Sequence, residues 1–117
     1  MKELLKKIYR SIKHLYYYVF CFHKFGYVGF GTKINSLTRI RGGKHVFIGR
    51  NCFSMDGLRI EAVVKWIDKE YSPEITIEDD VSVGQNCHFT AANKLHIGKG
   101  VSILPQVLIT DIEHEYV

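Results

Sequence analysis

The chain has 117 residues, 46% hydrophobic and 13% aromatic, with a formal net charge of +4. This length suits one domain with a modest core, and the composition excludes the polar, charge-rich class of disordered chains. Residues 1–24 hold six Lys or Arg against Glu3 alone, whereas residues 25–117 hold ten basic and eleven acidic residues. Because the basic excess is confined to one end, nucleic acid is not expected as a partner.

Apolar residues in the first segment recur at steps of three and four, as Leu5, Ile8, Ile12, Leu15, Val19 and Phe22. This spacing places them on one stripe of an amphipathic helix, predicted over residues 3–24 and treated as a segment of its own over residues 1–25. Two partners for the stripe stay open. It packs on the rest of the protein or on a partner subunit, or it makes a peripheral contact with an anionic membrane surface.

The location of the chain is predicted from its cysteines and its apolar run. Cys21, Cys52 and Cys87 are odd in number and far apart, so neither a disulfide framework nor a CxxC metal motif is indicated. The run over residues 15–22 lacks a small-residue cleavage site and is shorter than the ~20 residues that span a bilayer. A cytoplasmic location is expected, at the inner face of the membrane if the helix binds lipid.

From Val28 onward apolar residues recur at every sixth position. The series is Val28, Ile34 and Ile40, then Ile48 and Ile60 with Ser54 between them, then Ile77, Val83 and Phe89, then Ile97, Ile103 and Ile109. Eleven of these twelve positions are apolar and ten are β-branched, and every break in the series falls after a third hexad. Three short strands per turn indicate a coil with three flat walls.

The fold predicted for residues 26–117 is a parallel β-helix of about four coils. A six-residue strand is stable only when the next coil hydrogen-bonds to it, so the aliphatic residues should form inward ladders. Smaller inward residues are expected at the fifth position of each hexad, as Thr32, Thr38, Cys52, Val64, Val81, Cys87, Val101 and Val107. This makes Cys52 and Cys87 buried, reduced packing residues. The polar insertion at residues 65–74 is expected to protrude.

The hexads IGRNCF, VGQNCH, IGKGVS and ILPQVL resemble the hexapeptide-repeat acyltransferases. The stretch HFTAANKLHIGKGVSILPQVLITDIEHEY is similar to the sugar O-acetyltransferases that modify bacterial surface polysaccharides. The resemblance implies a left-handed coil, a homotrimer with active sites between subunits, acetyl-CoA as co-substrate without a metal, and a saccharide acceptor. Because members of this family continue for several coils past their catalytic histidine, the chain is expected to be a fragment with little activity of its own.

The same resemblance places His114 on the catalytic histidine of the family. A sugar hydroxyl must lose its proton as it attacks a thioester, and an imidazole is suited to accept it. Asp111 and Glu113 are candidates to orient the ring, as is Glu115. On composition alone, His114 also fits a solvated corner beside glutamates.

Four further residues are predicted to contact substrate: His88, Asn86, Trp66 and Tyr71. The family's acceptor-binding asparagine is replaced here by Gly84. Trp66 and Tyr71 come from the insertion, which otherwise packs on a neighbouring subunit.

Two other functions stay open. One is a catalytically silent β-helix that serves as an assembly or membrane-docking module. The other is a zinc enzyme like the γ-class carbonic anhydrases, although His88, His96 and His114 lack the required spacing.

Overall fold

The computed structural model describes residues 1–20 and 22–112. The chain begins with helix α1 (Lys2–Phe20), followed by a 3-10 turn, η1 (Phe22–Lys24), so the helix predicted over residues 3–24 is present but ends earlier as a regular α-helix. The strands that follow are β1 (Tyr27–Val28), β2 (Lys33–Ile34), β3 (Leu37–Arg41), β4 (Val46–Ile48), β5 (Phe53–Ser54), β6 (Leu58–Ala62), β7 (Lys65–Trp66), β8 (Lys69–Glu70), β9 (Glu74–Ile77), β10 (Ser82–Val83), β11 (His88–Ala91), β12 (Lys94–Ile97), β13 (Ser102–Ile103) and β14 (Leu108–Thr110), with a second 3-10 turn, η2 (Gly43–His45), before β4.

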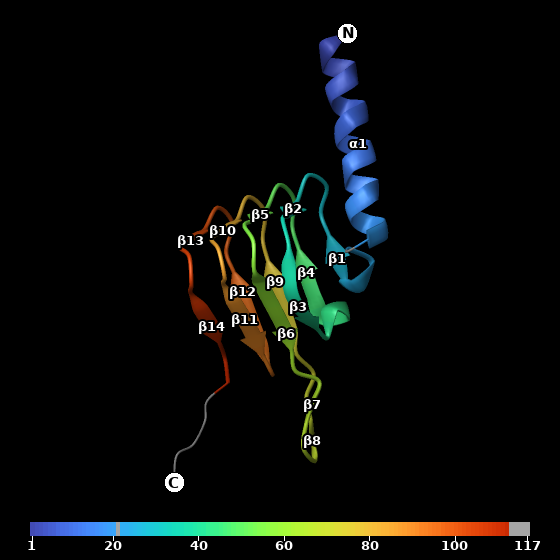
Figure 1. Cartoon of the computed structure of the whole chain (residues 1–117). Coiled ribbons are helices and arrows are strands. Elements are labelled where there is room, and N and C mark those ends of the chain that lie inside the picture. The colour runs from blue at the N-terminus through green and yellow to red at the C-terminus, as the bar shows by residue number, and fades with distance from the viewer. Residues whose placement is uncertain (21, 113–117) are drawn as a thin grey trace.

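Three four-stranded parallel sheets form the body of the protein (Figure 1). Sheet A contains β1, β4, β9 and β12, sheet B contains β2, β5, β10 and β13, and sheet C contains β3, β6, β11 and β14. Apart from the β7–β8 hairpin, the chain passes through sheets A, B and C in turn and then returns beside its previous strand in A. The prediction of mainly parallel β-structure with one N-terminal helix is confirmed, and this topology is compatible with a parallel β-helix.

The residues of the six-residue period stand side by side in the three sheets. Sheet A pairs Val28, Ile48, Ile77 and Ile97, sheet B pairs Ile34, Ser54, Val83 and Ile103, and sheet C pairs Ile40, Ile60, Phe89 and Ile109. Most of these side chains belong to one buried core or pack against it. A β-strand of two to five residues gains its stability from this stacking, because each strand satisfies the backbone groups of the next.

The two cysteines predicted to be buried and reduced are free and buried. Their thiols point at backbone carbonyls, with Sγ of Cys52 lying 3.1 Å from the oxygen of Glu78 and Sγ of Cys87 lying 3.2 Å from that of Leu104. Burial raises the pKa of the Cys52 thiol above its ordinary value. This thiol therefore stays protonated and acts as a packing group rather than a nucleophile.

Three of the fifth-position predictions are wrong. Val101 is 40% exposed, because β13, which follows it, is the edge strand of sheet B and no further described strand covers this end of the core. Thr38 is exposed, because the register of β3 against β6 shifts between Leu37 and Arg39 and places Leu37, instead of Thr38, opposite Leu58. Val64 is 42% exposed, because the chain leaves sheet C after Ala62 and enters the hairpin. A bulge and an insertion both break the six-residue count locally while leaving the ladders on either side intact.

A corner can require glycine either because there is no room for a Cβ or because the backbone is left-handed. In this protein the two requirements fall at different positions of the corner. Gly49 directly follows a ladder residue, and it is required by crowding, since a Cβ there would collide with Asp79 and with the backbone of Glu78. The left-handed backbone occurs two residues later, at Asn51 with φ 55°. Asparagine tolerates this conformation better than most residues with a Cβ, so the corner needs glycine at one position and asparagine, aspartate or glycine at the other.

Ser54 is the one polar residue in the ladders, and a void of about 20 Å³ lies beside it. Its hydroxyl is bound only locally, donating to the carbonyl of Met55 at 3.0 Å. We expect Ser54→Val to fill this void and to raise the free energy of unfolding by about 1 kcal/mol, as cavity-filling substitutions do. Urea denaturation measures the change. The matched control is Ser82→Val, on the exposed face of the neighbouring strand, and an equal gain in both variants would contradict the explanation.

Candidate functional site

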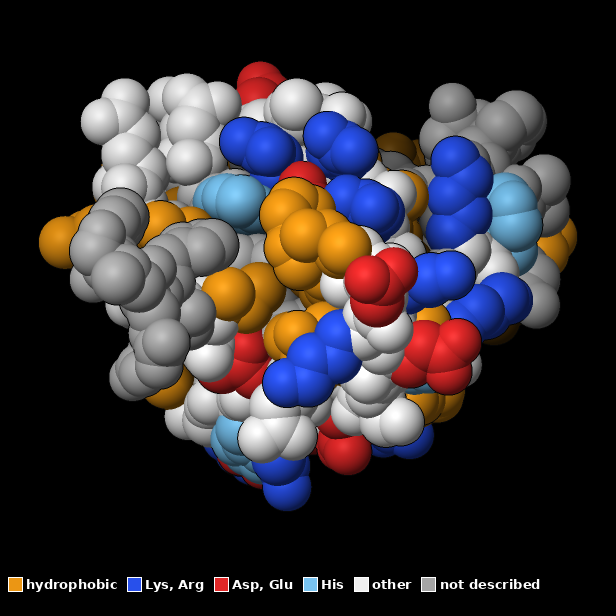
Figure 2. Space-filling model, turned by 90° about the horizontal axis from the view of Figure 1, so that it is seen from below, with side chains coloured by type: hydrophobic (Ala, Val, Ile, Leu, Met, Phe, Trp, Pro, Cys, Tyr) orange, Lys and Arg blue, Asp and Glu red, His pale blue; other side chains and the backbone are white. Residues whose placement is uncertain are grey.

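A cavity of about 440 Å³ lies over the outer face of sheet C (Figure 2). Its floor comes from β3, β6, β11 and β14, and the β7–β8 hairpin forms a wall. The lining residues are Arg41, Glu61, Val63, Trp66, Tyr71, His88, Thr90, Ala92, Leu108, Thr110 and Ile112. This volume falls in the range of small-molecule sites, which is about 300–1,000 Å³.

The register of sheet C explains why residues far apart in sequence meet in this cavity. Because side chains alternate across a strand, the residue after each inward ladder position points outward. These residues form one row of Arg41, Glu61, Thr90 and Thr110, and the residues before the ladder form a second row of Arg39, Arg59, His88 and Leu108. The whole first row, together with His88 and Leu108 of the second, lines the cavity floor.

The hairpin brings two aromatic side chains to the cavity. Strands β7 and β8 pair antiparallel, and the backbone N–H of Tyr71 donates to the carbonyl of Val64 at 2.7 Å, closing the base of the hairpin. Trp66 is 59% exposed although it is the largest side chain in the protein. Its neighbour at the tip, Ile67, has φ 58°, an unfavourable conformation for a β-branched residue. The hairpin thus holds an indole open to solvent at the cavity wall.

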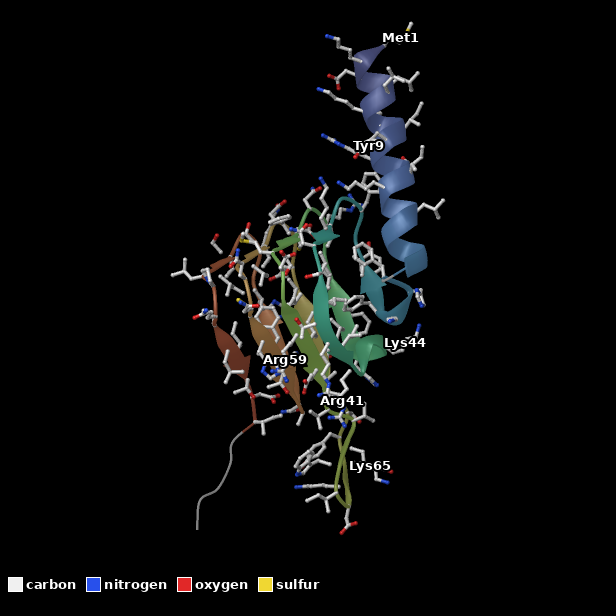
Figure 3. All side chains as sticks on the ribbon, viewed as in Figure 1. Met1, Tyr9, Arg41, Lys44, Arg59 and Lys65 are labelled. Carbon is white, nitrogen blue, oxygen red and sulfur yellow. The ribbon has the colours of Figure 1, made fainter. Side chains whose placement is uncertain are left out.

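Charge in the cavity floor is organised around Glu61. This carboxylate is 13% exposed and has three basic neighbours, Nη2 of Arg59 at 3.3 Å, Nε of Arg39 at 3.7 Å and Nε2 of His88 at 3.8 Å. Arg41 lines the cavity opposite Glu61 in the register, and no ion pair involves it within residues 1–20 and 22–112 (Figure 3). The floor therefore combines a partly neutralised carboxylate with an available guanidinium group.

His88 is held neutral in this setting. Burial of its ring lowers the pKa, the positive charge of Arg59 lowers it further, and Glu61 partly opposes both effects. Its Nε2 atom is buried and has no hydrogen-bond partner in the described part of the chain. Burying a nitrogen without a hydrogen-bond partner costs free energy. A ligand whose binding rearranges the side chains of the site would reduce this cost by forming a hydrogen bond with Nε2.

The depressed pKa of His88 makes stability depend on pH. Between the folded pKa and the ordinary value of 6.5, the unfolded chain binds the proton more tightly than the folded protein does. The free energy of unfolding should therefore fall as the pH is lowered through this window and be fully retained above pH 6.5. Urea denaturation at several pH values measures the slope, and His88→Gln should reduce it. An unchanged slope in the variant would assign the effect to other groups.

Asp111 has a role that the sequence did not indicate. Its Oδ1 accepts from the backbone N–H of Ala92 at 2.8 Å, and its Oδ2 accepts from those of Asn93 at 2.9 Å and Lys94 at 2.6 Å. The carboxylate thereby binds the turn between β11 and β12 to the chain that follows β14. Since Ala92 and Ile112 both line the cavity, Asp111 fixes one edge of the site.

The cavity brings together three of the four predicted substrate-binding residues: Trp66, Tyr71 and His88. Asn86 does not line it and occupies a left-handed corner with φ 55°. His114, Glu113 and Glu115 lie outside the described residues, and Ile112, the last described residue, lines the cavity.

Sequence reasoning missed Arg41 and Glu61. Their position directly after Ile40 and Ile60 in the six-residue period is the signal that places them in one row.

His96 lies away from the cavity, on β12 in sheet A, with Nε2 2.8 Å from Oε2 of Glu78. His88 and His96 thus belong to different sheets. In the described part of the chain, no three or more His, Cys, Asp and Glu side chains form a group suited to a metal ion. None of the described helices combines the length and apolar character needed to cross a membrane.

Comparison with protein-family models, with curated proteins and with solved structures gives no match to this chain. The cavity over sheet C and the hexad pattern are therefore the basis for assigning a function.

Proposed function

We propose that the protein is an O-acetyltransferase of the hexapeptide-repeat type that transfers an acetyl group from acetyl-CoA to a saccharide hydroxyl. In this proposal sheets A, B and C are the three walls of a left-handed β-helix of about four coils. The rotation of the chain through the three sheets supports it, as does the resemblance of the hexads to that family. Fold likeness alone does not specify chemistry, so the argument for a saccharide depends on the cavity.

The observation that carries the proposal is the meeting of Trp66, Tyr71 and His88 in one cavity of about 440 Å³. Aromatic rings offer a flat apolar surface to the C–H face of a sugar ring. The polar groups beside them, the guanidinium of Arg41, the carboxylate of Glu61 and the hydroxyls of Thr90 and Thr110, are donors and acceptors suited to sugar hydroxyls. An apolar wall with a few converging polar groups is the usual composition of a small-molecule site.

The chemistry that we propose is direct transfer. The sugar hydroxyl oxygen attacks the thioester carbonyl carbon, the new C–O bond forms and the C–S bond breaks. The imidazole of His114 takes the hydroxyl proton during attack and returns it to the departing thiolate, so no acyl-enzyme is formed. His114 follows Ile112 by two residues, and Ile112 lines the cavity.

Acetyl-CoA supplies the activated acetyl group when it is bound. We propose that it lies between subunits of a homotrimer, with the acceptor in the cavity over sheet C. The two free, buried thiols fit the reducing cytoplasm in which we place this activity.

Binding can be tested apart from catalysis, because Trp66 is the single tryptophan of the chain. Titration with a panel of neutral and acidic oligosaccharides should change its fluorescence, and the same saccharides should stimulate release of the CoA thiol and gain an O-acetyl ester. Saccharide-independent thiol release, or a saturable fluorescence change without transfer, would overturn the acetyltransferase assignment. The second outcome would favour a binding module on the same cavity.

A further inference from the structure

Helix α1 carries an apolar face that the described residues outside the helix leave exposed. The 19-residue helix makes its main contacts with η1, the turn that directly follows it, and it projects beyond the sheets (Figure 1). The described apolar side chains on the helix are all roughly half exposed or more: Met1 98%, Leu4 60%, Leu5 59%, Ile8 48%, Ile12 62% and Leu15 61%. A helix of this length is marginal in water unless its apolar face finds a partner.

The polar side of α1 is strongly basic. It carries Lys2, Lys6, Lys7, Arg10 and Lys13 against Glu3 alone. Side chains ending in nitrogen lie on one side of the helix, and side chains of carbon alone lie on the side away from the sheets (Figure 3). Lys2, Lys6, Arg10 and Lys13 recur at steps of four, four and three, with Lys7 beside Lys6, so the basic face runs along the helix parallel to the apolar face.

We propose that α1 docks the protein on an anionic lipid surface, with its apolar face inserted at the level of the headgroups. A large apolar face, a Lys- and Arg-rich polar face and low overall hydrophobicity are the properties of helices that lie in a membrane interface. The basic side chains complement anionic headgroups, each contributing about a fivefold gain in binding at low salt.

Charge favours this partner over packing between copies of α1. Lys2 and Lys13 lie at one edge of the apolar face and Lys7 lies at the other, so in a bundle these residues would approach lysines of the next helix. Glu3 is the only acidic residue of α1 and cannot balance five basic ones. Like charges at the edge of a helix interface are destabilising, whereas an anionic surface turns the same charges into attraction.

Docking through α1 leaves the cavity over sheet C uncovered. The helix and the β7–β8 hairpin project from opposite sides of the sheets (Figure 1). The inference is independent of the acetyltransferase proposal, because it concerns a different surface and is measured by lipid binding rather than by turnover.

Vesicle sedimentation of the full chain tests the proposal. We expect binding to phosphatidylcholine vesicles that contain phosphatidylglycerol, weakening of that binding as salt is raised, and little binding to phosphatidylcholine alone. The double variant Ile8→Asp with Ile12→Asp should bind more than tenfold more weakly. Lys6→Gln with Lys7→Gln should lose about fivefold for each charge at low salt.

The matched control removes two basic charges elsewhere. Lys65→Gln with Lys69→Gln lies in the β7–β8 hairpin and changes the net charge equally, so it should keep the binding of the unchanged protein. Equal losses in the two charge variants, or equal binding to vesicles with and without phosphatidylglycerol, would overturn the proposal. A third outcome would also overturn it: the protein does not bind vesicles, and its mass in light scattering is lower in the Ile8→Asp, Ile12→Asp variant than in the unchanged protein. That result would identify a bundle of α1 helices. Cooperative urea unfolding of each variant verifies that the sheets remain folded.

Discussion

Replacing His114 by alanine is expected to lower the rate of acetyl transfer by about 10²–10⁴-fold, which is the usual contribution of a general base. A saccharide hydroxyl stays protonated at neutral pH, so without the imidazole the attack on the thioester would have to release its proton to water. The change removes an interaction made only during the reaction. It should therefore lower kcat and kcat/KM together and leave saccharide binding, followed by the fluorescence of Trp66, unchanged.

The matched control for this variant is His96→Ala. The side chain of His96 lies close to the carboxylate of Glu78, but His96 is on sheet A and its side chain is 51% exposed. Its removal should change the rate less than twofold by this argument. Retained turnover in His114→Ala, with an unchanged mass in light scattering, would exclude His114 as the base and direct attention to His88, the neutral imidazole in the cavity floor.

The sheets could be predicted from the sequence because one physical requirement recurs along the chain. Each strand of sheets A, B and C needs an inward apolar side chain, and the ladder of Ile40, Ile60, Phe89 and Ile109 meets this need in sheet C. Each position contributes to the pattern separately. The six-residue period can therefore still be recognised although Ser54, between Ile34 and Val83 in sheet B, is polar.

The cavity could be predicted only in part. Trp66 and Tyr71 were identified because they interrupt the period in a polar insertion, but Arg41 and Glu61 meet only through the register of β3 and β6. The side chains of Arg41 and Glu61 point outward and are polar, so the hydrophobic period does not identify them. The role of Asp111 was missed for a related reason, since it binds backbone N–H groups, which carry no residue-specific signal in the sequence.

Replacing Trp66 by alanine is expected to weaken the use of saccharide by about tenfold. If the acceptor covers about 60 Å² of the indole, the loss at about 25 cal/mol per Å² is about 1.5 kcal/mol, and 1.4 kcal/mol corresponds to a factor of ten. We expect the indole, at a wall built by the hairpin, to contact parts of the saccharide that do not react, and so to bind the ground state and the transition state equally. The loss should therefore appear in KM with kcat unchanged.

Ile67→Gly distinguishes a role of the indole from a role of the hairpin as a whole. Ile67 is 75% exposed at the tip of the hairpin, does not line the cavity and has a positive φ that glycine adopts without strain. The glycine variant removes apolar bulk next to Trp66 while relieving the turn, so its KM should match that of the unchanged protein. An equal rise of KM in both variants would mean that the hairpin acts by its shape or by packing on a neighbour. A rise in Trp66→Ala alone would assign the contact to the indole ring.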